Sequence, residues 1–372
     1  MNILILEPFF SGSHAQWARE IQKFSRHNVS LCTMTGRNWK WRMHGGAVTL
    51  ARKFLESDHV PDLILATDML DLAGFMGLAR KKLGNIPVAI YFHENQLTYP
   101  WSPKDRDRRK NRDHHYGFIN IQSALAADRV LFNSHFHMQS FLGAIPGFLK
   151  AFPDYNETGV VEIIREKSSV LPLGMDLARF DEVEAVDDMP GRADDKELLL
   201  WNHRWEYDKN PGEFFDVMYS LEKKGAGFSL ALLGEEKGST HDAFVKAKKK
   251  LSHRIRQFGY APSFREYALW LWEAGLLPVT SNQDFFGISI MEAMYCRCVP
   301  LLPRRLTYPE LVPESEFPRV FYNSPDELLG KLEQFITSGP PYNGNDFRQI
   351  AARYDWSRMI GIYDDLFEKI HR

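Results

Sequence analysis

Short apolar runs alternate along this chain with longer stretches in which apolar residues recur every three or four positions. Short apolar runs bounded by turns are typical of buried parallel strands, whereas the longer periodic stretches predict helices. In the first half the pattern predicts strands over residues 2–6, 29–34, 62–66, 87–92, 130–132 and 170–173, with helices such as 15–24 and 72–83 between them. This alternation predicts an α/β fold with a doubly wound parallel sheet.

The same alternation starts again in the second half of the chain. It predicts strands over residues 198–201, 229–233, 277–280 and 299–302, and helices over 212–224, 240–250, 263–273 and 288–295. An acidic stretch with glycine and proline separates the halves, and 372 residues exceed the usual size of one core. We therefore expect a first domain over 1–180, a linker over 181–196, a second domain over 197–355, and an amphipathic helix within 356–372 that packs back across the linker.

Composition narrows the class of protein. The formal net charge is -2, so contact with nucleic acid has to come from local basic patches. The three cysteines, Cys32, Cys296 and Cys298, lack metal-binding spacing and are odd in number, which argues against zinc and disulfides and for a reducing, cytoplasmic location. The apolar run at the N-terminus is too short for a signal peptide, and no run is long enough to span a membrane.

Polar residues follow several strands of the first half directly. Gly12 and His14 follow the first strand, Asp68 the third, and the HENQ sequence from His93 to Gln96 the fourth. Ligands of such sheets bind at the carboxyl ends of the strands, so these residues are candidates for a site. A single histidine at a strand end is more often structural, but four consecutive polar side chains favour a cleft.

The stretch from Thr280 to Cys296 predicts a phosphate-binding turn in the second half. A strand end is followed by Asp284, an aromatic pair and Gly287, after which a helix should begin. The amides of Gly287 to Ser289 would then lie at a helix N-terminus, which favours anions. With Asp284 and Glu292 on either side, the turn suits a nucleotide-sugar, whose phosphates lie between hydroxyl-bearing ends. The alternative is an ordinary strand-turn-helix unit.

The sequence NHRWEYDKNP supplies two cations after the first strand of the second half. Arg204 and Lys209 precede Pro211, which favours the start of a helix. Together a planar guanidinium and a mobile ammonium can neutralise a departing diphosphate. The alternative is a surface pair balanced by Glu206 and Asp208.

The pair Arg204 and Lys209, followed by Asp284 and Glu292 at the two ends of an acid-x7-Glu pattern that contains FFGISIM, resembles the donor-site signature of retaining GT-B glycosyltransferases. The resemblance implies that the cations clamp the diphosphate, the helix amides bind phosphate, the second acid binds ribose and the first binds the sugar. One departure is Asp284, because the first acid of the signature is usually the longer Glu.

Longer sequence strings in the first half resemble one particular family of these glycosyltransferases. The chain is similar over nearly its whole length to the tRNA-queuosine mannosyltransferase family. The strings that carry this similarity are ILEPFFSGSH, GRNWKWRMHGGA, TDMLDLAGF and YFHENQLTYPW in the first half and NHRWEYDKNP in the second. The resemblance implies a GT-B fold, with two Rossmann-like domains facing across a cleft. It also implies transfer of α-mannose from GDP-mannose to the cyclopentenediol of queuosine in an aspartate tRNA anticodon, with no metal and no cofactor. Gly12 stands where two glycines are expected.

The expected site residues fall into three groups. His93 is our first choice for a group that binds the sugar or helps remove the acceptor proton, and the catalytic candidates are His93, Glu94 and Asp284. The donor-binding candidates are Gly12, Arg204, Lys209, Phe286, Gly287, Ile288, Ser289 and Glu292. The candidates for tRNA contact are Arg37, Trp39, Lys40, Trp41, Arg42, His44, Asn95, Gln96, Arg108 and Arg109.

The tRNA candidates mix aromatic and basic side chains, which is the combination that stacks on bases and binds phosphates. Segment 37–44 can also be an ordinary amphipathic segment with buried tryptophans. The charged loop 102–115 and the basic stretch Lys246 to Arg256 are further candidates, although runs of charge are usually solvated surface.

Other functions remain open at this point. The acceptor can be a lipid or a small glycan, or the protein can be a sugar-nucleotide epimerase or hydrolase of the same fold. A third class is a non-catalytic RNA-binding protein, against which the joint presence of both cations and both acids argues. Residue patterns alone leave open the donor base, the sugar and the oligomeric state.

Overall fold

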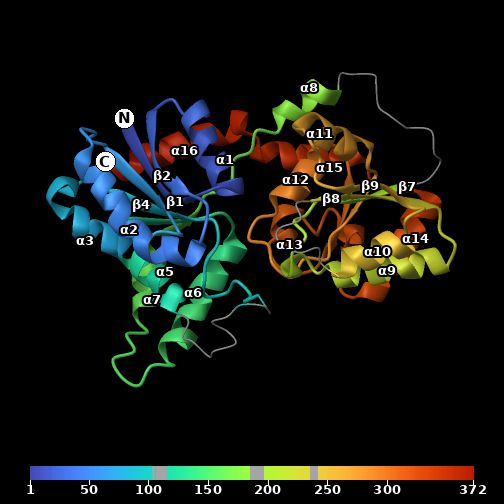
Figure 1. The fold of residues 1–372 in the computed structure, drawn as a ribbon, viewed down its shortest axis with the longest axis horizontal. Coiled ribbons are helices and arrows are strands. Elements are labelled where there is room, and N and C mark those ends of the chain that lie inside the picture. Colours follow the sequence, from blue (N-terminus) through green and yellow to red (C-terminus); the bar gives the residue numbers. More distant parts are fainter. Residues whose placement is uncertain (103–104, 106–114, 185–196, 235–241) are drawn as a thin grey trace. The chain divides into compact units, whose positions relative to one another are not determined.

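The computed structural model describes all residues except 103–104, 106–114, 185–196 and 235–241. The chain divides into two compact units, Met1–Met175 with Trp356–Arg372, and Asp176–Asp355. Among the described residues each unit contains a six-stranded parallel sheet with helices around it (Figure 1). The predicted α/β class with two parallel sheets is confirmed.

In the first sheet the chain crosses over between β1 and β3, which is typical of a doubly wound fold. The strands in spatial order are β2 (Asn28–Thr35), β1 (Asn2–Phe10), β3 (Leu63–Thr67), β4 (Val88–Phe92), β5 (Arg129–Phe132) and β6 (Ser168–Val170). The helices of this unit are α1 (Gly12–Phe24), α2 (Trp39–Glu56), α3 (Leu72–Leu83), α5 (His115–Ala126), α6 (His135–Leu149), α7 (Val160–Glu166) and α16 (Trp356–His371).

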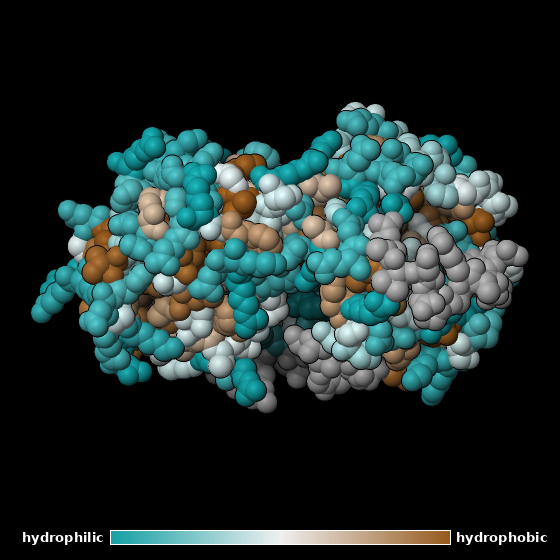
Figure 2. Space-filling model, turned by 90° about the horizontal axis from the view of Figure 1, so that it is seen from above, coloured by the Kyte–Doolittle hydropathy of each residue, from teal (hydrophilic) through white to brown (hydrophobic). Residues whose placement is uncertain are grey.

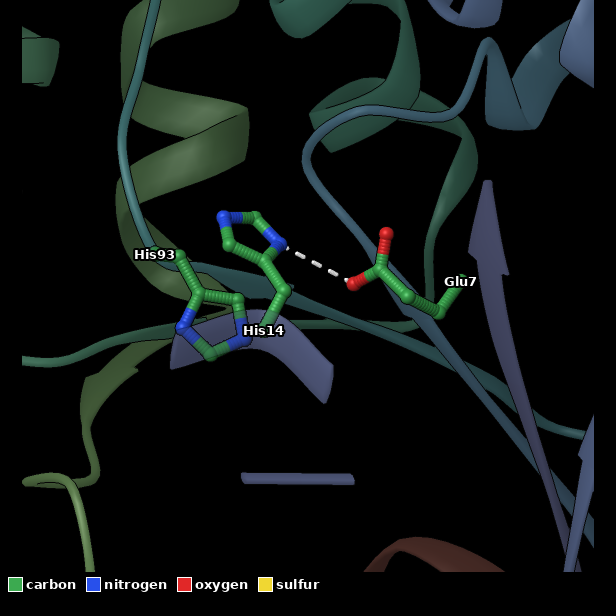
Figure 3. A group of neighbouring side chains, drawn as sticks. All are labelled: Glu7, His14 and His93. Atoms are coloured by element: carbon green, nitrogen blue, oxygen red, sulfur yellow. Dashed lines mark hydrogen bonds and ion pairs between the residues drawn. The ribbon is translucent and has the colours of Figure 1, made fainter. Parts of the chain in front are cut away.

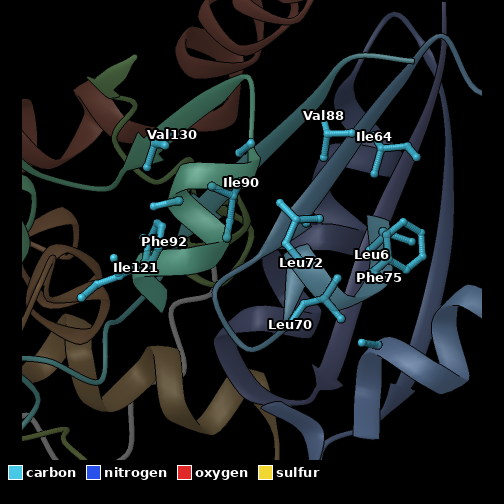
Figure 4. Close-up of a cluster of buried hydrophobic side chains, with 14 of the residues drawn as sticks. Leu6, Ile64, Leu70, Leu72, Phe75, Val88, Ile90, Phe92, Ile121 and Val130 are labelled. Atoms are coloured by element: carbon cyan, nitrogen blue, oxygen red, sulfur yellow. The ribbon is translucent and has the colours of Figure 1, made fainter. Parts of the chain in front are cut away.

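Helices on the sheet faces bury the central strands completely. Every residue of β3 and β4 is buried, which explains why both strands are continuous apolar runs. Figure 4 shows part of this core, in which Leu6 and Ile64 lie near Phe75. The core holds the strand ends in place, and these ends carry the polar residues of the first unit.

The C-terminal helix α16 belongs to the first unit. Figure 1 shows it in red near α1, and several contacts join the two helices. Trp356 Nε1 donates to Glu20 Oε2 at 2.5 Å, and Ser25 Oγ donates to Asp364 Oδ1 at 2.6 Å. The chain therefore returns to the first unit after completing the second.

The second sheet is also entirely parallel. Its strands in spatial order are β12 (Phe321–Tyr322), β11 (Val299–Pro303), β10 (Leu276–Pro278), β7 (Glu197–Trp201), β8 (Phe228–Leu233) and β9 (Ile255–Gly259). The α-helices are α8 (Asp181–Glu184), α9 (Pro211–Lys223), α10 (Asp242–Lys250), α11 (Phe264–Glu273), α12 (Ile288–Tyr295), α13 (Tyr308–Leu311), α14 (Pro325–Ser338) and α15 (Gly344–Ala351). Short 3-10 helices are η1 (Ala178–Phe180), η2 (Tyr207–Lys209), η3 (Pro318–Val320) and η4 (Ala352–Tyr354).

The sequence pattern missed β9 and β12. Every residue of β9 is only partly buried, so its apolar signal is weak, and β12 has just two residues. The boundary between the units also differs from the expected residue 180. Phe180 belongs to the second unit because its ring packs against Phe264 at a centroid distance of 4.9 Å, and its carbonyl accepts from Trp272 Nε1. Of the expected linker, residues 185–196 lie outside the described residues.

Hydrophilic residues predominate on the face that Figure 2 shows, and hydrophobic residues form only small patches there. Among the described helices, none combines the length and the apolar character needed to cross a membrane.

Candidate functional site

The turn predicted to bind phosphate in the second unit has the expected conformation. Gly287 takes a left-handed conformation, with φ of 97°, and is the N-cap of α12, which runs from Ile288 to Tyr295. The first amides that donate within the helix are those of Ile290 and Met291, both to the Gly287 carbonyl. The preceding amides, of Ile288 and Ser289, have no acceptor in the first turn of a helix. This end of α12 can therefore bind an anion.

Lys209 and Asp284 form an ion pair beside this turn. Lys209 Nζ lies 2.7 Å from Asp284 Oδ1 and also donates to the Gln283 carbonyl at 2.7 Å. Tyr308 Oη donates to the other oxygen of Asp284 at 2.6 Å. Burial alone would raise the pKa of Asp284, but the Lys209 ammonium and these hydrogen bonds hold it below its usual value. Asp284 therefore stays ionised and can accept hydrogen bonds from hydroxyl groups.

Arg204 is the more accessible of the two cations. Its side chain is 50% exposed, whereas that of Lys209 is 9% exposed. The guanidinium lies 3.5 Å from Glu206 and 4.0 Å from Asp208. Glu206 and Asp208, the acids expected to balance this charge, are thus close to Arg204. Because such long, partly solvated ion pairs are weak, the guanidinium can still bind a diphosphate.

Glu292 sits in a network of polar side chains that sequence reasoning did not find. Its Oε1 accepts from Arg179 at 3.1 Å, and its Oε2 accepts from Tyr267 Oη at 2.7 Å. Asn202 Nδ2 donates to Tyr267 Oη at 3.3 Å and to the Ser289 carbonyl at 2.7 Å. These bonds fix Glu292 at the side of the phosphate-binding turn.

His203 is another residue that the sequence reasoning missed, although it stands in the NHRWEYDKNP string. Its Nδ1 lies 2.9 Å from Ser289 Oγ, and its buried Nε2 has no hydrogen-bond partner among the described residues. Burial lowers the pKa of His203 to about 4, so the ring is neutral. Phe286 is buried against Tyr354, so its ring supports the turn from inside the fold. The second unit thus combines Arg204, Lys209, Asp284, Gly287, Ile288, Ser289 and Glu292 around one turn.

In the first unit, Glu7, His14 and His93 lie together where β1 and β4 end. His14 Nδ1 is 3.0 Å from Glu7 Oε2, and the His14 and His93 rings have a centroid distance of 4.2 Å (Figure 3). Burial opposes charge on His14, but the Glu7 carboxylate raises the pKa of His14 to about 9. Glu7 was not among the candidates, since an acid within a strand gives no sign of its partner.

His93 remains neutral beside this ion pair. Burial, with His14 and His137 adding to it, holds its pKa well below the usual value. Its backbone N–H donates to Asp68 Oδ1 at 2.8 Å, and its buried Nε2 has no partner among the described residues. Burial raises the pKa of Asp68 to about 8, with Glu94 adding to the shift and His14 opposing it. A neutral imidazole with an unused ring nitrogen can donate or accept a hydrogen bond.

These residues also offer three potential metal ligands. One ligand atom from each of Glu7, His14 and His93 lies within 4.8 Å of the other two. Glu7 raises the pKa of His14 to about 9, so a metal at this position would have to displace the proton that His14 shares with Glu7. The contact that the structure shows among these side chains is the ion pair of His14 with Glu7.

The remaining candidates of the first unit differ in exposure. Gly12 is exposed, with φ of 52°, and belongs to the first unit, whereas the other donor candidates belong to the second. Gln96 Nε2 donates to Glu94 Oε1 at 2.9 Å, and both are partly exposed. Asn95 is fully buried, and its Oδ1 accepts from the amides of Leu97 and Thr98. Asn95 thus shapes the loop from inside.

The tryptophan-rich segment forms the first turns of α2, and its two tryptophans differ. Trp41 is 63% exposed, whereas Trp39 packs against Tyr116 at a centroid distance of 5.1 Å. Lys40 is paired with Asp105 at 2.7 Å. Arg42 donates to the Thr35 carbonyl, His44 Nε2 lies 2.8 Å from His115 Nε2, and Arg37 is exposed. Arg37, Trp41 and His44 are the exposed members; Arg108 and Arg109 lie outside the described residues.

Both halves of the chain match models of known protein families. Residues 2–175 match the family model "tRNA-queuosine alpha-mannosyltransferase N-terminal", and residues 183–352 match "Glycosyl transferases group 1". The tRNA-queuosine alpha-mannosyltransferase of Drosophila melanogaster is 34% identical over 381 aligned residues, which cover 99% of this chain and 97% of the relative. The chain belongs to the tRNA-queuosine α-mannosyltransferase family.

Other similarities agree with this family. A GDP-mannose:cellobiosyl-diphosphopolyprenol alpha-mannosyltransferase of Xanthomonas oryzae is 25% identical over 53% of this chain and 51% of the relative. Among solved structures, a UDP-forming trehalose-phosphate synthase from Burkholderia xenovorans superposes with a TM-score of 0.71 at 11% identity, covering all of both chains. The fold is therefore GT-B, and membership of the family makes the chain a glycosyltransferase.

Proposed function

We propose that this protein transfers α-mannose from GDP-mannose to queuosine in tRNA, with the aspartate tRNA anticodon as the acceptor. The observation that carries the proposal is the similarity to the Drosophila relative, which extends over both units and whose name gives the sugar and the acceptor. The similarity thus covers both the unit with the predicted phosphate-binding turn and the unit with the family-specific strings. A transferase is accordingly favoured over an epimerase, a hydrolase or a non-catalytic RNA-binding protein.

The second unit supplies the groups for a nucleotide-sugar. Arg204, Lys209 and the amides of Ile288 and Ser289 would bind the diphosphate, because they combine two cations with a helix N-terminus. Glu292 would bind the ribose hydroxyls and the ionised Asp284 the sugar hydroxyls. The Xanthomonas relative, whose name specifies GDP-mannose, supports the choice of donor.

We propose a front-face reaction in which configuration at the sugar carbon is retained. Arg204 and the helix amides stabilise the negative charge that develops on the diphosphate as the glycosidic bond breaks. The departing diphosphate accepts the proton of the attacking hydroxyl, and the bond to the acceptor forms on the same face. Neutral His93 would hydrogen-bond the sugar or the acceptor hydroxyl through a ring nitrogen.

We further propose that the reaction needs no metal and takes place in the cytoplasm. The cations at the phosphate-binding turn do the work that a divalent ion does in other transferases. The free thiols of Cys32, Cys296 and Cys298 are compatible with a reducing compartment.

The donor is tested by supplying one nucleotide-sugar at a time to protein and queuosine-containing tRNA, with and without excess chelator. Digested tRNA is then analysed by mass spectrometry. We expect queuosine to gain one hexose with GDP-mannose, equally with chelator present, and to remain unchanged with UDP-glucose. A gain with UDP-glucose alone, or a loss of activity on chelation, would contradict the donor or the metal-free mechanism.

A lipid-linked acceptor is a second candidate, because the name of the Xanthomonas relative gives a diphosphopolyprenol acceptor. That similarity covers about half of the chain, whereas the Drosophila relative matches 99% of it. A lipid-linked glycan added to the same assay as the competing acceptor decides between them: mannose should enter the tRNA and leave the lipid unlabelled.

A further inference from the structure

We infer that the last turns of α10 form an RNA-binding surface that contacts phosphates of the tRNA away from the modified nucleoside. We call this surface the lysine patch; it consists of Lys246, Lys248, Lys249 and Lys250, with the Tyr219 ring. The inference rests on the proposed function, since it concerns how the same tRNA acceptor is held.

The lysine patch differs from the other basic residues of the second unit. Most of these are paired with carboxylates: Lys224 lies 2.8 Å from Glu333, and Arg254 lies 2.7 Å from Glu222. The patch lysines are all exposed, and within the described residues none of them forms an ion pair. Their positive charge is therefore available to a polyanion, although the protein as a whole has a net charge of -2.

Aromatic rings hold several of these ammonium groups. Lys246 Nζ and Lys250 Nζ lie 5.3 and 5.1 Å from the centroid of the Tyr219 ring, and Lys248 Nζ lies 4.7 Å from that of Phe258. The buried Tyr219 hydroxyl has no hydrogen-bond partner among the described residues. Cation–π contacts restrict the lysine side chains and so lower the entropy lost when they bind a phosphate.

The topology separates the lysine patch from the donor-binding turn. Helix α10 connects the parallel neighbours β8 and β9, so it runs antiparallel to them and its last turn points toward the amino ends of the strands. Asp284 and Gly287 follow β10 at the opposite, carboxyl edge. A nucleotide-sugar has no need of the patch, whereas a tRNA extends far beyond its anticodon.

A simpler role for the lysines is to stabilise the C-terminus of α10 through the helix dipole. That role predicts a loss of thermal stability when the charge is removed, with equal effects on every acceptor. Phosphate contact predicts weaker binding of full-length tRNA alone.

The test compares Lys246→Gln/Lys250→Gln with Lys224→Gln/Lys331→Gln, whose lysines are paired with Glu333 and Glu327. For the patch variant we expect about tenfold weaker tRNA binding and a slope of log Kd against log salt that is smaller by about 1.8, as for two lost phosphate contacts. The control variant and Lys246→Arg/Lys250→Arg should bind like the wild type.

Turnover of a queuosine-containing anticodon stem-loop should be unchanged in the patch variant, with the same melting temperature. Wild-type tRNA affinity and salt slope in the patch variant would overturn the inference, as would an equal loss on the stem-loop. If the wild-type protein modifies neither RNA, the proposed function itself fails, which distinguishes the two outcomes.

Discussion

Lys209 Nζ lies 2.7 Å from Oδ1 of Asp284, and both side chains are largely buried, at 9% and 14% exposure. The pair joins one residue of the predicted diphosphate clamp to the acid expected to bind the sugar. Asp284 is one methylene shorter than the Glu that is usual at this position of the signature. Its carboxylate contacts Lys209 directly. Tyr308 fixes the other oxygen of Asp284, which leaves the carboxylate little freedom.

Replacing Lys209 by Met should destabilise the protein by about 3 kcal/mol, because it leaves the Asp284 charge buried without its partner. The double variant Lys209→Met/Asp284→Asn removes both charges and should recover much of that loss. Denaturant unfolding measures both. Lys331→Met, which breaks the exposed pair with Glu327, is the control and should change stability by less than about 1 kcal/mol. A double variant less stable than the single one would contradict the coupling.

Gly287→Ala should weaken donor binding and lower stability by about 1–2 kcal/mol, because a side chain is strained at a φ of 97°. An added Cβ would also lie 3.2 Å from Ile290 Cδ1. Gly330→Ala is the matched control. Gly330 is an exposed residue within α14 with open space around its Cβ position, so alanine should be neutral or slightly stabilising. Calorimetric titration with GDP-mannose measures the donor affinity of both variants, and unchanged affinity in Gly287→Ala would argue against this turn as the phosphate site.

Protein stability should fall as the pH rises from about 6.5 toward 9. The folded-state pKa of His14 is raised to about 9, so its ion pair with Glu7 contributes full stability below the unfolded value and loses it as the pH passes 9. Asp68, with a pKa raised to about 8, acts in the same direction, because its neutral form is favoured in the fold. In His14→Gln the melting temperature should depend less on pH over this range. The same pH dependence in variant and wild type would show that His14 is not the group involved.

His93→Ala should lower kcat about 100-fold or more and affect GDP-mannose affinity far less, because the hydrogen bond of His93 acts mainly in the reaction step. His93→Gln, which keeps a hydrogen-bonding side chain, should retain more activity than His93→Ala. Single-turnover kinetics with bound donor separate the chemical step from binding. Wild-type turnover in His93→Ala would exclude the role.

The strong patterns of the sequence were sufficient for the fold class, most of the strands and part of the helices, but they did not predict α2, α6 or α14. Residues 288–295 form a helix as expected, because Gly287 and the apolar spacing after it fix both its start and its face. Strand β9 was missed because its partly buried residues lie next to the lysines of α10, where charge hides the apolar pattern.

Side-chain partners were much harder to predict than elements. Arg179 and Tyr267 meet Glu292 only through tertiary packing, as each comes from a different part of the second unit. Glu7 occupies a buried strand, and its role became visible only when the fold brought it to His14. Sequence reasoning also could not separate the packed Trp39 from the exposed Trp41, since neighbouring residues on a helix face different directions.

The central claim is that queuosine in tRNA accepts the sugar. The most direct measurement is to incubate the protein with radiolabelled GDP-mannose and with tRNA that either contains or lacks queuosine, and to count the label that enters each RNA. Label should enter the queuosine-containing tRNA alone. Label in neither tRNA, or equal label in both, would contradict the account.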